Sequence, residues 1–74
     1  MPFTRHKHYD INAVPIPRAS GRWAVEVHVF ADNERHVVKL HTQLLPNDYA
    51  TEFEAIEAGA TYGCRWIDDL PPQP

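Results

Sequence analysis

The sequence predicts an α+β domain in which a three-stranded antiparallel sheet is followed by one C-terminal helix packed on one face of the sheet. Two runs of alternating apolar and polar residues predict neighbouring strands, and a capping signal followed by apolar residues at helical spacing predicts the helix. The chain has 74 residues, and a chain of this size buries only about 60% of the surface that its unfolded form exposes. We therefore expect one small domain.

We expect this domain to span residues 9–70. Residues 1–8 are expected to form a frayed N-terminus, because terminal segments are poorly ordered unless other elements hold them. Residues 71–74 read Pro-Pro-Gln-Pro and are expected to form a disordered proline tail.

The first predicted strand is Tyr9–Ile16. Its first apolar residues alternate, whereas Val14 and Ile16 fall on the other parity, and this change predicts a bulge or the end of the strand. Pro15 and Pro17 cannot donate hydrogen bonds to a ladder, so an edge strand is predicted.

The next two strands are predicted to form a β-hairpin. Arg22–Phe30 alternates cleanly, Arg35–Leu45 repeats the pattern, and the polar segment 31–34 connects them. Both strands place their apolar residues on one face when the numbers of paired residues add up to 65. Val27 is then opposite Val38, and Val25 is opposite Leu40.

The helix is predicted to begin after Thr51, which is a good N-cap, with Glu54 three residues later completing a capping box. Pro71 and Pro72 end it. Advancing about 100° per residue gathers six small or apolar residues into the stripe that we expect on the sheet. They are Phe53, Ile56, Ala60, Gly63, Cys64 and Ile67.

A second apolar flank of the helix predicts a candidate protein interface, which consists of Tyr62, Trp66 and Gly59. Aromatic residues are favoured anchors of interfaces. Gly59 and Gly63 also lie inside the helix, where each costs about 1 kcal/mol relative to alanine, so something is expected to approach the backbone closely there. Two interpretations stay open: the chain's own sheet and loops cover this flank, or a second subunit or another protein does.

The outer face of the predicted sheet offers an alternative, nucleic-acid binding, through Arg22, Phe30, Arg35 and Lys39. Basic side chains there would contact phosphates while the aromatic ring contacts a base or sugar. The competing interpretation is a solvated face in which Glu26 pairs with Lys39 across the strands.

Charge divides the chain into two unequal halves, within a net charge of −3. Residues 1–45 hold six Lys and Arg against four Asp and Glu, together with all five histidines, whereas residues 46–74 hold one Arg against six Asp and Glu. The first half would attract anions weakly, and the second half would repel them.

The residues predict no catalytic, cofactor or metal site. His28 and His41 lie roughly 13 Å apart in the predicted register, which is too far for two ligands of one ion. Cys64 is the only cysteine and lies on the expected core stripe, where a thiol behaves as a small hydrophobic group. We expect a protein that is not an enzyme, does not enter a membrane and resides in the cytoplasm.

Two resemblances accompany these residues. The order of three antiparallel strands and a helix is similar to the small sheet-reading DNA-binding domains at the N-termini of some phage and transposon integrases, which implies DNA binding through the sheet. The sequence around Thr51, Glu54, Gly59 and Trp66-Ile67-Asp68 resembles small uncharacterised bacterial proteins in which a β-meander leads into a helix, and this resemblance implies no activity.

The sequence therefore predicts a small non-catalytic binding module that acts by self-association, as a homodimer, or by docking to a protein partner. Nucleic-acid binding through the outer face of the sheet is the alternative.

Overall fold

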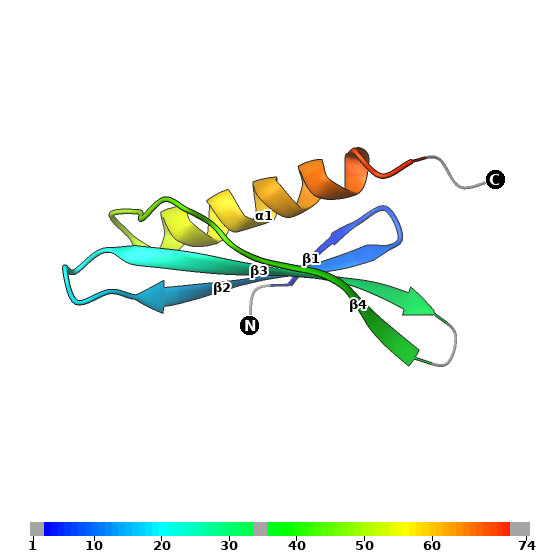
Figure 1. Ribbon diagram of the computed structural model, residues 1–74, viewed down its shortest axis with the longest axis horizontal. Helices are drawn as coiled ribbons and strands as arrows, with labels where there is room; N and C mark the ends of the chain where they lie inside the picture. The colour runs from blue at the N-terminus through cyan, green and yellow to red at the C-terminus, as the bar shows by residue number, and fades with distance from the viewer. Residues whose placement is uncertain (1–2, 34–35, 72–74) are drawn as a thin grey trace.

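The protein is an α+β domain with two layers, in which one helix lies on one face of a four-stranded antiparallel sheet (Figure 1). A computed structural model describes residues 3–33 and 36–71. The strand order is β1-β2-β3-β4, so each strand pairs with its neighbour in the chain. The elements are β1 (Phe3–His6), β2 (Tyr9–Pro17), β3 (Trp23–Asn33), β4 (His36–Leu44) and α1 (Glu52–Asp68). The α+β class, the antiparallel sheet and the single C-terminal helix are confirmed.

The sheet has four strands, so the prediction of three strands is wrong. The additional strand, β1, lies in the segment that was expected to be frayed, and it pairs with β2 through Thr4 opposite Ile11 and His6 opposite Tyr9. A two-residue turn joins them, and Lys7 in this turn adopts the left-handed conformation with φ 57°. Residues 1–2 of the predicted frayed end and residues 72–74 of the predicted tail lie outside the described residues.

The turn between β1 and β2 is tied to the end of the helix. Nε2 of His6 lies 2.8 Å and Nζ of Lys7 lies 2.9 Å from Oδ1 of Asp68. Hydrogen bonding from His6 and then from Lys7 lowers the pKa of Asp68 below its ordinary value of 3.8. In Figure 1 this turn lies beside the C-terminal half of α1.

Strand β2 continues without a bulge to Pro17, with Val14 opposite Glu26 and Ile16 opposite Ala24 on the outer face of the sheet. The predicted bulge or early end is therefore wrong. The position of the prolines explains why β2 tolerates them: β1 pairs only with residues 9–12 of β2, so β2 has a free edge at Pro15 and Pro17.

The hairpin of β3 and β4 exists, but its predicted register is wrong. Val27 is opposite Gln43 rather than Val38, and Val38 is opposite Ala31. A register shift between Val29 and Phe30 leaves Leu40 as an extra residue in β4. The cause is the position of the turn: β3 runs on to Asn33, through a polar segment that was expected to be the turn.

The helix begins as predicted, because the Thr51 hydroxyl accepts a hydrogen bond from the Glu54 backbone N–H at 3.0 Å. The predicted core stripe is rotated from its true position. Phe53 is 67% exposed, and the residues buried against the sheet are Ala55, Gly59, Gly63 and Ile67.

The two glycines let the helix backbone approach the sheet closely. A Cβ atom on Gly59 would lie 2.8 Å from Cβ of Ala13 and 2.9 Å from Cγ2 of Val25, and one on Gly63 would lie 2.6 Å from Cγ2 of Ile11. Contacts this short do not occur between carbon atoms without a shift of one partner. The core between the layers is correspondingly thin, and its largest fully buried side chains are Ile11, Val25, Val27 and Val29.

We predict that Gly59→Ala lowers the free energy of unfolding by roughly 1 to 2 kcal/mol, since overpacking costs about 1–3 kcal/mol and exceeds the gain of about 1 kcal/mol in helix propensity. Cβ of Ala13 is fixed to the strand backbone, so it cannot turn aside. Urea denaturation measures the difference.

The exposed Thr61→Ala on the same helix serves as the control and should be neutral within about 0.5 kcal/mol. A stabilised Gly59→Ala protein would contradict the close approach, because helix propensity alone favours alanine.

Candidate functional site

The structure separates the three residues of the predicted interface. Gly59 is buried against β2 and β3, so it is not available to a partner and is no longer part of the candidate interface. Tyr62 and Trp66 are partly buried and contact His41 of β4. Trp66 stacks on the His41 ring with centroids 4.6 Å apart, and the Tyr62 hydroxyl lies 2.8 Å from Nε2 of His41. The chain's own strand thus covers part of this flank.

The outer face of the sheet brings together only part of the predicted nucleic-acid site. Lys39 lies over the Phe30 ring, with Nζ 5.9 Å from the centroid. Arg22 donates instead to the backbone carbonyl of Asp48 at 3.0 Å, and Arg35 lies outside the described residues. The predicted pairing of Glu26 with Lys39 is also wrong, because Glu26 is opposite Leu44.

The centre of the outer face holds a histidine with partners on both ring nitrogens. Nε2 of His28 lies 2.8 Å from Oε1 of Glu26, and Nδ1 lies 3.4 Å from Oγ1 of Thr42. A hydroxyl, an imidazole and a carboxylate in this order resemble a nucleophilic triad, but such chemistry also needs donors directed at an oxyanion. The backbone N–H groups of β3 serve the ladders to β2 and β4, and those of Thr42 and Leu44 point sideways from the edge of the sheet. This cluster is therefore better explained as polar surface contacts, one within β3 and one between β3 and β4.

His28 and His41 lie on opposite faces of the sheet, because their positions in β3 and β4 differ in parity in the observed register. The predicted register had placed both histidines on the same face, separated along the strands. Among the residues that the structure describes, no three His, Cys, Asp or Glu side chains are grouped to hold a metal ion. Within the same part of the chain, no helix is long and apolar enough to cross a membrane.

The most unusual surface is the edge strand β4. Four of the five large apolar side chains that are exposed among the described residues lie on it: Val37, Val38, Leu40 and Leu44, with 61%, 45%, 42% and 43% of their surface exposed. The backbone of α1 lies over β2 and β3 and touches β1 at a few residues. It does not lie over β4. Figure 1 shows the β3–β4 hairpin bending away from the helix.

The backbone of β4 also has free hydrogen-bonding groups along its outer edge. The Leu45 N–H donates to the Val25 carbonyl at 3.0 Å, and in an antiparallel pair the residues that bond to the partner alternate with residues that do not. Gln43 and His41 therefore direct their N–H and C=O groups toward β3, whereas Thr42 and Leu44 direct theirs away from the sheet. The Leu44 carbonyl accepts a hydrogen bond from the Gln43 side chain at 2.9 Å, which leaves the Thr42 N–H, the Thr42 carbonyl and the Leu44 N–H free within the part of the chain that the structure describes.

The two edges of the sheet differ in how they are protected. Strand β1 has only four residues and carries Arg5, which pairs with Asp10 at 3.1 Å. Short length and charge are the usual means by which proteins prevent an edge from pairing with another chain. Strand β4 has nine residues and a single Lys or Arg, Lys39, at its edge. Apart from Lys39, the bulge at Leu40 is the one feature of this strand that would hinder pairing with another chain.

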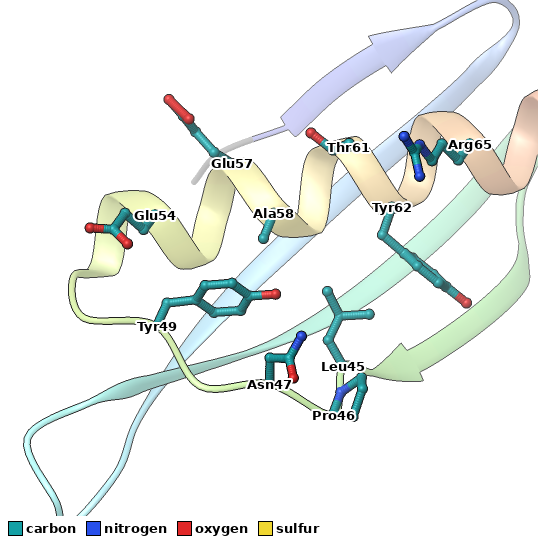
Figure 2. Close-up of a pocket in the computed structure, with 10 residues that line it drawn as sticks. All are labelled: Leu45, Pro46, Asn47, Tyr49, Glu54, Glu57, Ala58, Thr61, Tyr62 and Arg65. Carbon is teal, nitrogen blue, oxygen red and sulfur yellow. The ribbon is translucent and has the colours of Figure 1, made fainter.

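A groove lies between α1 and the loop that follows β4 (Figure 2). Its volume is about 600 Å³. Tyr49 directs its ring into it from the loop, and Tyr62 extends from the helix toward β4 at one side of it. The remaining lining residues are Leu45, Pro46, Asn47, Glu54, Glu57, Ala58, Thr61 and Arg65.

Comparison with protein-family models, with curated proteins and with solved structures found no match for this chain. The resemblances to integrase DNA-binding domains and to small bacterial meander proteins therefore gain no support from these comparisons.

We predict that Tyr62→Phe lowers the free energy of unfolding by about 1 kcal/mol, the typical net contribution of one hydrogen bond, because the change removes the hydroxyl that contacts His41. The aromatic ring stays in place, so packing is preserved.

The same substitution in a His41→Ala background should have a smaller effect, since the partner is already absent, and chemical denaturation of the four proteins gives this coupling. Equal effects in both backgrounds would show that the hydrogen bond is absent in solution.

Proposed function

We propose that this protein is a non-catalytic binding module that self-associates by pairing β4 with β4 of a second copy. The observation that carries the proposal is the edge of β4, where the backbone N–H groups of Thr42 and Leu44 and the Thr42 carbonyl point away from β3 beside four exposed aliphatic side chains. Exposed, long and apolar edges pair readily with another strand.

A second copy fits this edge for reasons of symmetry and charge. Two identical strands related by a two-fold axis can pair antiparallel, and such an isologous interface needs only one surface. The sequence of β4 contains no Asp or Glu, so two copies can meet there without acid–acid repulsion although each carries a net charge of −3. Because α1 lies over β2 and β3, neither helix stands in the path of the added strand.

The small core supplies a thermodynamic reason for association. Among the described residues, the core holds four large side chains that are fully buried, together with Leu45, Ile67 and small residues. Domains below about 80 residues usually need a further source of stability, and oligomerisation is one of them. Burying Val37, Val38, Leu40 and Leu44 between subunits would add apolar contact that the monomer lacks.

Nucleic-acid binding through the outer face has less support. Glu26 and Asp10 lie on the same face as Lys39 and Phe30, and Arg22 is held by the loop at Asp48. A phosphate backbone would meet carboxylates along this surface.

We predict that Thr42→Pro weakens self-association at least tenfold, which corresponds to about 1.4 kcal/mol. The Thr42 N–H faces away from β3, so proline removes a donor from the outer edge while the β3–β4 ladder is retained. Sedimentation velocity over a series of protein concentrations measures the dissociation constant.

Thr42→Val is the matched control, because it loses the hydroxyl that contacts His28 but keeps the N–H, and it should associate like the original protein. If Thr42→Pro does not fold, Leu40→Lys places a charge on the same edge and should also give monomers. A protein that is monomeric at every concentration up to millimolar, or variants that associate unchanged, would refute the proposal.

A further inference from the structure

We propose that the groove between α1 and the loop at residues 45–49 binds a short extended peptide segment of another protein. This segment carries a basic residue at one end, a carboxylate four or five residues away and proline or aliphatic residues between them. The inference goes beyond self-association, since the groove is a different surface from the outer edge of β4.

The apolar middle of the groove is shaped to hold such a segment. Figure 2 shows Ala58 and Tyr62 on the side of α1 that faces the loop, with Leu45 and Tyr49 opposite them. A volume of about 600 Å³ falls within the range of about 300–1,000 Å³ that is usual for binding pockets. Aromatic-lined grooves are the surfaces on which proline-rich extended segments dock.

The loop that forms one wall is held in place before any ligand arrives. The backbone N–H of Tyr49 donates to the Trp23 carbonyl at 2.7 Å, and the Trp23 N–H donates to the Tyr49 carbonyl at 2.8 Å. Arg22 holds the carbonyl of Asp48, and Leu45 bonds to Val25. A wall fixed in this way lowers the entropic cost of binding.

The charged groups at the two ends of the groove lack partners among the residues that the structure describes. Arg65 is the one Arg or Lys among the described residues whose side chain makes no hydrogen bond, ion pair or ring contact. The carboxylates of Glu54 and Glu57 likewise make no such contact with the part of the chain that the structure describes. These groups are free to bind charges of a ligand.

The spacing of these charges sets the length of the ligand. Glu57 and Glu54 precede Arg65 by eight and eleven residues, so they lie about 12 and 17 Å away along the helix axis at about 1.5 Å per residue. An extended polyproline segment advances about 3.1 Å per residue, so four to five residues span this distance. The basic residue of the peptide then meets Glu54 and its carboxylate meets Arg65. The Glu57 side chain points away from the loop in Figure 2, so Glu57 adds negative charge near this end rather than a direct contact.

The test uses two capped peptides of the same composition, Arg-Pro-Leu-Pro-Glu and Glu-Pro-Leu-Pro-Arg, titrated into the 15N-labelled full chain. We expect saturable NMR shifts at residues 45–49 and along the groove side of α1, with tighter binding of one chain direction than of the other. Arg65→Glu should weaken binding of the preferred peptide at least fivefold, and Glu52→Arg, outside the groove on the same helix, should leave it unchanged.

The double variant with Glu57→Arg and Arg65→Glu should reduce or reverse the preference between the two peptides. Absence of saturable shifts for both peptides, or equal binding to the original protein and to Arg65→Glu, would overturn the proposal. Binding to the monomeric Thr42→Pro variant but not to the associated protein would assign the groove to the second copy and would also overturn it. The peptide titrations of the original protein and of Arg65→Glu do not depend on whether β4 pairs, which sedimentation reports separately.

Discussion

The close approach of α1 to β2 and β3 is the constraint on which the rest of the structure depends. Gly59 and Gly63 lie so near Ala13, Val25 and Ile11 that a single added carbon atom would clash. The backbone of a helix held at this distance lies above β2 and β3, and α1 reaches β4 through Tyr62 and Trp66 at His41 while leaving its outer edge uncovered. The uncovered edge of β4 and the groove beside residues 45–49 both follow from this placement.

Local signals in the sequence predicted much of the fold. The capping residue Thr51 predicted the start of the helix, and alternation predicted the three longer strands. Strand β1 was missed because residues 3–6 contain one apolar residue and show no alternation. The register of β4 was wrong because apolar residues occupy both of its faces, as Val37 and Val38 show, so matching faces selected a false pairing.

The candidate site was harder to predict, because it depends on the rotation of the helix. The large apolar side chain of Phe53 outweighed the small residues Ala55 and Gly59 in the pattern, so Phe53 was placed on the sheet, although Gly59 correctly indicated that something approaches the backbone. For Tyr62 and Trp66 the sequence left open whether the chain's own sheet or a partner covers them, and both contact His41 of β4. Apolar residues on both faces of β4 were the one sequence signal that its edge is exposed. The arrangement of the helix over β2 and β3 is needed to interpret this signal.

Amide hydrogen exchange along β4 at two protein concentrations tests the central claim most directly. His41 and Gln43 bond to β3, so their amides should be protected at both concentrations. Thr42 and Leu44 point away from the sheet, so pairing with a second copy predicts that their amides are protected at high concentration and exchange rapidly on dilution. Rapid exchange of Thr42 and Leu44 at both concentrations, beside protected neighbours, would show that β4 remains a free edge and would contradict the claim.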